Sequence, residues 1–300
     1  MKSSCALLLA LFSVAHAAGP IPFANVTRLT MMAVNVDIAP DQSFGLTLNA
    51  SNVTAANFGR ALACARQQNP DIELVITLGL NIPVWNEAAR RVSEFGPVAA
   101  QFLASHGLAG MNFDWEDSVD THVYMKLLSG LRKAFDDATA AGASGGKRML
   151  ITVAPGWPRY PWDATAIGVV DAFDMMSYND ELSDLTSRVA LFTGTYGLPK
   201  SMLLGAIETE PHWQGTPGWN SDPDIVQKTK YAVETQLQGM FSFRIDNDHG
   251  PWPVTPRQPT YHGHQLMAAT AMAATGGELR GFVLNTYMSL HDPFQPGQLC

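Results

Sequence analysis

The chain has 300 residues, of which 46% are hydrophobic and 15% are charged, and its formal net charge is −8. This length fits one large or two small globular domains. The negative charge disfavours nucleic acids and anionic membrane surfaces as partners. Composition therefore predicts a globular protein that binds neither.

The first 17 residues predict a secretory signal peptide. Lys2 precedes an apolar run at residues 6–14, and residues 15–17 read Ala-His-Ala, the small-residue spacing of a cleavage site. The apolar run is too short to span a membrane. We therefore expect a secreted protein whose residues 18–300 form a single domain without a membrane anchor.

Cysteine and histidine usage predicts no metal site. Cys5 belongs to the signal peptide, and in an oxidising compartment Cys64 and Cys300 either pair or stay as free thiols. His262 and His264 stand at an apparent helix start and indicate a solvent-exposed cap rather than a ligand pair. Neither a metal nor a cofactor is expected.

Short apolar runs alternate with longer amphipathic stretches along the chain. The turn after Val36 lacks the glycine-rich phosphate-binding sequence that is typical of a doubly wound open sheet, the alternative fold. Eight strands alternating with helices predict an α/β protein with a (β/α)8 TIM barrel. The predicted strands are 29–36, 73–80, 110–116, 149–155, 172–178, 202–208, 240–246 and 281–287. The clearest helices are 124–141, 224–237 with Asp222 as the N-cap, and 261–275.

One predicted strand carries polar side chains along a single face. Asn112, Asp114 and Glu116 occupy alternate positions, so their side chains point the same way. Carboxylates that face an interior are costly unless they are satisfied or used. This strand therefore indicates a catalytic site, with a structural polar network as the alternative.

Other polar and aromatic residues follow the predicted strands, where a barrel of this kind places its active site. Asn179 follows the fifth strand and Glu208 ends the sixth. An aromatic rim above carboxylates is typical of a carbohydrate site, although local packing is the alternative for each ring. The tryptophans after strands are Trp85, Trp157, Trp162, Trp213, Trp219 and Trp252.

These residues resemble glycoside hydrolase family 18, the chitinases and endo-β-N-acetylglucosaminidases. The family motif D-G-x-D-x-D-x-E reads AGMNFDWE at residues 109–116, and the family's M-x-Y-[DN] reads MSYN at residues 176–179. Residues 239–246 resemble the closing strand, with Phe243 in place of a tryptophan. The resemblance implies a barrel that hydrolyses N-acetylglucosamine-containing glycans, either chitin or N-glycans.

The resemblance also implies residue roles. Glu116 would be the general acid, and Asp114 would orient the substrate's N-acetyl group, which acts as the nucleophile in this family. Tyr178 would donate a hydrogen bond to the acetamide carbonyl. The remaining substrate-binding candidates are Asn112, Asn179, Phe243, Glu208 and Trp157.

Two departures from the family pattern stand out. Asn112 replaces an aspartate that, in the family, pairs with the residue at the Asp114 position and helps it to change partners during turnover. The motif also lies on the third predicted strand, whereas the family has it on the fourth. We therefore expect a permuted barrel in which strand 281–287 fills the first-strand slot, between strands 240–246 and 29–36.

Two other functions remain open at this point. A lectin that binds chitin or N-glycans would keep the barrel without turnover, which the loss of charge at Asn112 favours. A different retaining hydrolase would pair Glu116 with Glu208 as a true nucleophile, which requires carboxyl groups ~5–5.5 Å apart.

Overall fold

The computed structural model describes residues 21–48, 55–78, 82–115, 120–156, 162–178, 181–209, 220–246, 248 and 263–289. The expected signal peptide lies outside these ranges, as do Cys300 and His262. None of the described helices is long and apolar enough to cross a membrane. Cys64 is disulfide-bonded, and its partner lies outside the described ranges.

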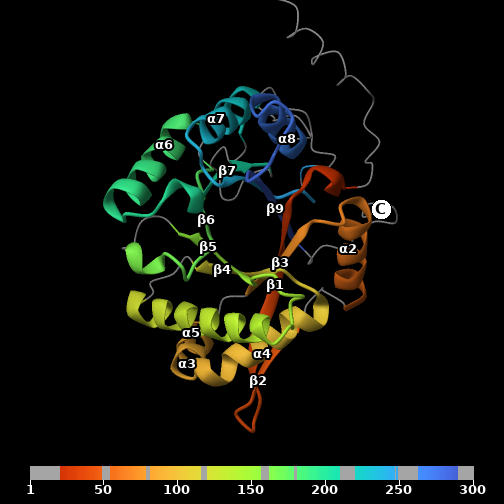
Figure 1. The fold of residues 1–300 in the computed structure, drawn as a ribbon, viewed down its shortest axis with the longest axis vertical. Coiled ribbons are helices and arrows are strands. Elements are labelled where there is room, and N and C mark those ends of the chain that lie inside the picture. The colour runs from red at the N-terminus through yellow and green to blue at the C-terminus, as the bar shows by residue number, and fades with distance from the viewer. Residues whose placement is uncertain are drawn as a thin grey trace, which may run out of the picture.

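Eight parallel strands in the described part of the chain form a closed barrel, as predicted (Figure 1). Neighbouring strands pair in parallel around the barrel, and the last strand pairs with the first. This closure excludes the open doubly wound sheet. The barrel strands are β1 (Arg28–Ile38), β3 (Glu73–Leu78), β4 (Gly110–Trp115), β5 (Leu150–Pro155), β6 (Ala172–Asp174), β7 (Leu203–Glu208), β8 (Gly239–Phe243) and β9 (Val283–Ser289).

Helices surround the barrel (Figure 1) and cover the outward side chains of its strands. Phe113 on β4 and Phe173 on β6 are both fully buried in this outer layer. The α-helices are α2 (Ala55–Gln68), α3 (Ile82–Arg90), α4 (Val92–His106), α5 (Thr121–Ala140), α6 (Leu182–Ala190), α7 (Asp222–Glu234) and α8 (Gly263–Ala274). Shorter turns of helix are Phe23–Asn25, Ala164–Ala166 and Lys200–Met202, with a π-helical turn at Leu191–Thr195.

Several predicted boundaries differ from the structure, and three of them are instructive. β6 ends at Asp174, earlier than expected, because the chain beyond it folds into a turn in which the Ser177 amide donates to the Met175 carbonyl. β8 ends at Phe243, whose peptide bond to Arg244 is cis. The N-cap of α7 is Ser221 and not Asp222: its hydroxyl oxygen accepts a hydrogen bond from the backbone of Asp224.

The structure contains a strand that the sequence analysis missed. β2 (Phe44–Leu48) pairs antiparallel with the end of β1 and lies outside the barrel, as a hairpin that projects from it (Figure 1). Arg91 holds the hairpin by donating to the Gln42 carbonyl at 2.8 Å and by lying 4.7 Å from the centre of the Phe44 ring. The alternation of Phe44, Leu46 and Leu48 was the available signal.

The C-terminal strand lies where the permuted barrel predicts. β9 pairs with β8 on one side and with β1 on the other, so counting from β9 places the motif strand β4 fourth in the barrel. The contact between β8 and β9 is close at Gly239, because a Cβ there would lie 1.9 Å from the carbonyl oxygen of Val283. Barrel closure therefore depends on the absence of a side chain at this position.

Replacing Gly239 with alanine should destabilise the barrel by about 1–3 kcal/mol, because the added methyl group overpacks the β8–β9 contact. Gly59→Ala is the matched control, since Gly59 is an exposed helical glycine with open space around it, and this change should be neutral or stabilising by up to about 1 kcal/mol. Urea unfolding of both variants measures the two effects. Equal stability of Gly239→Ala and the wild type would contradict the close contact.

Candidate active site

The barrel interior is polar on one side and apolar on the other. The apolar side is a cluster of inward residues that includes the aromatic rings of β8 and β9. The polar side comes from β1, β3, β4, β5, β6 and β9 and is buried throughout. Its side chains are Thr30, Thr77, Asn112, Thr152, Asp174 and Asn285.

Asn112, a predicted substrate-binding residue, is fully buried within the polar side. Its Nδ2 donates to Thr152 Oγ1 at 2.8 Å and to Asp174 Oδ2 at 3.3 Å. Its Oδ1 accepts from Thr77 Oγ1 at 3.4 Å. The amide thus links three neighbouring strands to β6, and both of its polar atoms are engaged inside the barrel.

Asp174 is a buried carboxylate that the sequence analysis did not single out. Its Oδ2 accepts hydrogen bonds from the Tyr287 hydroxyl at 2.6 Å, from Asn112, and from Asn285 Nδ2 at 3.4 Å. Burial raises the pKa of Asp174 to about 6, and the Tyr287 hydrogen bond and the charge of Arg28 offset this only in part. The signal was available: an acidic residue inside an apolar strand is as informative here as in the motif.

Tyr287 donates a hydrogen bond to Asp174 and also experiences the charge of Asp114 on the motif strand. Burial raises the pKa of Tyr287 well above its ordinary value, and the negative charges of Asp174 and Asp114 raise it further. The phenol therefore lies within electrostatic range of both carboxylates. Asp114 itself is partly buried near the end of β4, at the C-terminal mouth of the barrel.

Two further predicted residues meet at the boundary of the apolar side. The ring of Tyr178 lies 5.9 Å from that of Phe243 and 5.8 Å from that of Phe241. The Tyr287 ring lies 5.7 Å from Phe243 and 5.4 Å from Phe241. These four rings form an aromatic box next to the polar network, and the box contains Tyr178 and Phe243 as the sequence analysis proposed for the site.

Two buried residues hold the ends of β6 and β7 in place, and sequence reasoning missed both. Asn220 accepts a hydrogen bond from the Glu208 amide at 2.8 Å and donates to the Tyr178 carbonyl at 3.2 Å. Lys228 on α7 is fully buried and donates to the Ser177 carbonyl at 2.8 Å. Glu208, at the end of β7, and Tyr178 are therefore positioned by their backbones.

Glu116, Asn179 and Trp157 lie outside the described residues.

The prediction of an aromatic rim is wrong for the two tryptophans that can be placed. Trp85 and Trp162 are buried, with 2% and 6% of their surfaces exposed. Trp85 packs against Phe113 at 5.6 Å between ring centres, and Trp162 packs against Phe173 at 4.8 Å. Both rings fill the layer between strands and helices.

The prediction of a solvent-exposed histidine cap at α8 is also wrong. His264 is fully buried, and its Nδ1 lies 3.1 Å from Ser242 Oγ. The helix is capped by the buried Asp248, which accepts from the backbone amides of Gly263 and His264. Burial raises the pKa of Asp248 to about 7. This polar cluster lies on the outer side of β8, away from the barrel interior.

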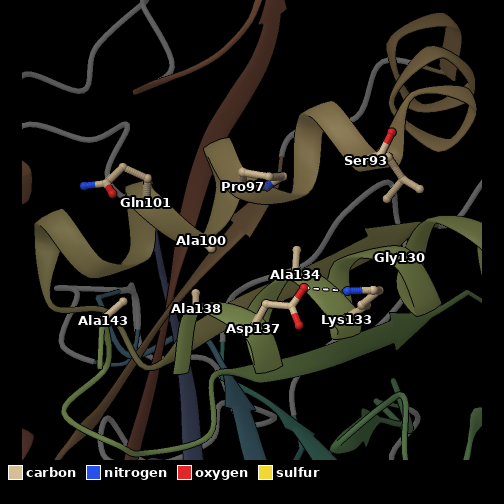
Figure 2. Close-up of a pocket in the computed structure, with 11 residues that line it drawn as sticks. Ser93, Pro97, Ala100, Gln101, Gly130, Lys133, Ala134, Asp137, Ala138 and Ala143 are labelled. Atoms are coloured by element: carbon tan, nitrogen blue, oxygen red, sulfur yellow. Dashed lines mark hydrogen bonds and ion pairs between the residues drawn. The ribbon is translucent and has the colours of Figure 1, made fainter. Parts of the chain in front are cut away.

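A groove of about 370 Å³ lies between α4 and α5, in the outer helical layer (Figure 2). Figure 2 shows small side chains of the two helices around it and the Lys133–Asp137 ion pair at its edge, with a separation of 2.6 Å. None of the predicted site residues lines this groove. The groove is therefore separate from the predicted site residues that the structure describes.

Comparison with solved structures assigns the fold. A chitinase from Cycas revoluta, crystallised with allosamidin, shares 14% sequence identity and a TM-score of 0.62, covering 85% of this chain and 96% of that one. A chitinase from Flavobacterium johnsoniae gives 14% identity and a TM-score of 0.61, covering 93% of each chain. Both are described as family 18 glycoside hydrolases. The barrel has a family 18 fold.

An agglutinin also has a similar fold. A chitinase-like agglutinin from Robinia pseudoacacia shares 17% identity and a TM-score of 0.62, covering 86% of this chain and 96% of that one. No family model matches the sequence, and no curated protein matches it. At these identities the similarity establishes the fold, while the roles of Glu116, Asp114 and Tyr178 remain predictions.

The stability of Asp174→Asn relative to wild type should increase as the pH rises. The folded-state pKa of about 6 exceeds the ordinary 3.8, so burial of the ionised carboxylate opposes folding above about pH 6 and not below about pH 4. The stability of the variant relative to wild type should therefore improve by about 2 kcal/mol between about pH 4.5 and pH 7.5. Urea unfolding at both pH values measures this difference.

Asp41→Asn is the control for this experiment. Hydrogen bonds from Ser43 lower the pKa of this exposed carboxylate. The stability of Asp41→Asn relative to wild type should therefore fall, if it changes at all, as the pH rises. A pH-independent difference between Asp174→Asn and wild type would contradict the buried, titrating carboxylate.

Proposed function

We propose that this protein is a secreted glycoside hydrolase that cleaves β-1,4-linked N-acetylglucosamine in chitin or chito-oligosaccharides, with Glu116 as the general acid. The observation that carries the proposal is the Asp114-x-Glu116 sequence at the end of β4 in a family 18 fold. Active sites of (β/α)8 barrels form at this end of the strands, and Asp114 lies there, partly buried.

The proposed reaction is substrate-assisted. The carbonyl oxygen of the sugar's own N-acetyl group attacks the anomeric carbon while Glu116 gives its proton to the departing glycosidic oxygen. Water then opens the resulting oxazolinium ion, and Glu116 recovers a proton from that water. Asp114 would orient the acetamide and stabilise the positive charge of the ion, because a carboxylate interacts more strongly with a charge away from bulk water.

Aromatic and polar groups near Asp114 support a sugar substrate. Tyr178 and Phe243 present rings that border the polar network, and a sugar ring packs its apolar face on such rings. The Cycas revoluta chitinase has been crystallised with (GlcNAc)3 as well as with allosamidin. Tyr178 would donate its hydroxyl hydrogen to the acetamide oxygen.

A lectin is the second candidate function, and Asn112 favours it. This buried amide holds no charge and exchanges no proton, although its position in the family motif belongs to an aspartate. The similarity to the Robinia pseudoacacia agglutinin supports the same alternative. Such a protein would bind chitin or N-glycans through the same aromatic box without releasing product.

A retaining hydrolase that pairs Glu116 with Glu208 is the third candidate. Glu208 lies at the end of β7, on the same face of the barrel as the end of β4. This scheme needs the two carboxyl groups ~5–5.5 Å apart and does not need an acetamido sugar. Substitution of Glu208 therefore separates it from the substrate-assisted scheme.

Glu116→Gln should abolish most product release from chitotetraose, lowering kcat by ~10²–10⁴-fold, because the amide cannot protonate the leaving oxygen. Glu208→Gln is the comparison variant: loss of a substrate-binding carboxylate should raise KM, while kcat should stay within about threefold of wild type. Chromatography of released sugars measures both rates, with a high-mannose glycopeptide as the second substrate.

Each outcome of this assay selects one function. Loss of activity in both variants would favour the Glu116–Glu208 pair. No release by wild type, together with retained binding of chitotetraose, would favour the lectin. Activity of Glu116→Gln equal to wild type would remove Glu116 from the mechanism.

Phe243→Ala should weaken chitotetraose binding about threefold to tenfold, because the lost ring contact contributes about 0.5–1.5 kcal/mol. Phe102→Ala is the control, since Phe102 lies on the outer helix α4 and is also only partly buried. Calorimetric titration gives both affinities. Unchanged affinity in Phe243→Ala would place the sugar away from the aromatic box.

A further inference from the structure

Asp174 is a buried carboxylate that accepts a hydrogen bond from Asn112, the residue that replaces an aspartate of the family motif. The geometry points to Asp174 as a positioning residue: through Tyr287 and Asn112 it directs the Asp114 carboxylate toward the mouth of the barrel, where the substrate's N-acetyl group would bind. This inference rests on the proposed function. Under this inference, Asp174 on β6 supplies the negative charge that the family motif carries on β4 at the position of Asn112.

The hydrogen bonds of Asp174 determine which groups face Asp114. The hydroxyl hydrogen of Tyr287 is committed to Asp174 Oδ2 at 2.6 Å, so the phenol offers its other neighbours only lone pairs. Nδ2 of Asn112 is committed to Asp174 and Thr152. The Tyr287 hydroxyl hydrogen and Nδ2 of Asn112 are therefore not directed at Asp114, so these two donors do not compete with an acetamide N–H for its carboxylate.

The charges around Asp174 reinforce this orientation. Tyr287 experiences the negative charges of both Asp174 and Asp114, and an interior of low dielectric constant strengthens these interactions. Arg28 on β1 is the cation whose charge acts on Asp174, and it is shared with Glu73 on β3 through an ion pair of 2.8 Å. Among the described residues, Arg28 and Tyr287 act directly on Asp174, and Asp114 on β4 and Tyr178 act on Tyr287.

A purely structural role does not account for a carboxylate at this position. Among the described residues, only Oδ2 of Asp174 accepts hydrogen bonds, and Oδ1 is buried without a partner. An asparagine would accept the same three bonds through one oxygen and would avoid burying a charge. Buried polar atoms are otherwise satisfied in most proteins, so a charge retained here indicates that the charge itself is used.

The test is a set of three variants assayed on chitotetraose between about pH 4.5 and pH 8. Asp174→Asn should lower kcat about ten- to hundred-fold with KM within about threefold, because the reacting groups are misaligned and binding is retained. Wild type should show a fall in kcat below about pH 6, where Asp174 becomes protonated, and this variant should not. The swap Asn112→Asp with Asp174→Asn returns the charge to β4 and should recover kcat to within about fivefold of wild type.

Asp248→Asn is the matched control. Asp248 is also a buried carboxylate with a raised pKa, but it caps α8 outside the barrel interior. It should keep the kcat of wild type and the same fall below about pH 6. A swap variant as slow as Asp174→Asn alone, or an equal loss of kcat in Asp248→Asn, would overturn the positioning role.

A second measurement does not depend on catalysis. Titration calorimetry of chitotetraose at about pH 6 in two buffers of different ionisation enthalpy counts the protons exchanged on binding. Wild type and Asp248→Asn should exchange more protons than Asp174→Asn, because the latter lacks the carboxyl group with a pKa of about 6 in the network next to the bound sugar. If wild type releases no product, the proposed hydrolase fails while this exchange still decides the inference; equal exchange in wild type and Asp174→Asn overturns it.

Tyr287→Phe keeps the inference testable if Asp174→Asn does not fold. This change removes the donated hydrogen and leaves the carboxylate in place. It should lower kcat in the same direction as Asp174→Asn, with KM again within about threefold. A folded Tyr287→Phe variant with the kcat and proton exchange of wild type would overturn the route through the phenol.

Discussion

The buried carboxylate of Asp174 is the constraint on which the interior of this barrel depends. A charge without access to water needs hydrogen-bond donors at fixed positions, and here they come from β4 and β9 rather than from neighbouring strands. Tyr287 and Asn285 reach Asp174 only because β9 occupies the slot between β8 and β1. Closure of the barrel and stabilisation of the charge are therefore one requirement, and a barrel that closed differently would leave Asp174 without its strongest donor.

The division of the interior into a polar and an apolar side follows from the same arrangement. Hydrogen bonds among threonine, asparagine and aspartate side chains stabilise one side, while rings from β8 and β9 fill the other. Asp114 and Tyr178 stand where the two sides meet at the mouth. The proposed substrate has the same two-sided character, since the face of its sugar ring is apolar and its N-acetyl amide is polar.

The position of the negative charge distinguishes this barrel from the family motif that it resembles. The resemblance places two interacting aspartates on one strand, two residues apart. This chain has Asn112 at the first of these positions, and a buried carboxylate on β6, Asp174, accepts hydrogen bonds from Asn112 and Tyr287. Inward side chains from all strands of a barrel share one small volume. Carboxylates on two different strands can therefore place a negative charge in the same region of the barrel interior.

The sequence by itself determined the barrel, because alternation and spacing report which residues face a core and how many strands follow one another. It also gave the strand that carries the motif and the place of the C-terminal strand. Only the tertiary structure decided that Asp174 accepts a hydrogen bond from Tyr287. It also decided that Trp85, Trp162 and His264 are buried in the outer layer. These outcomes depend on contacts between segments far apart in the chain. Periodicity gives the face on which a side chain lies, but only strand pairing and helix packing determine what it meets there.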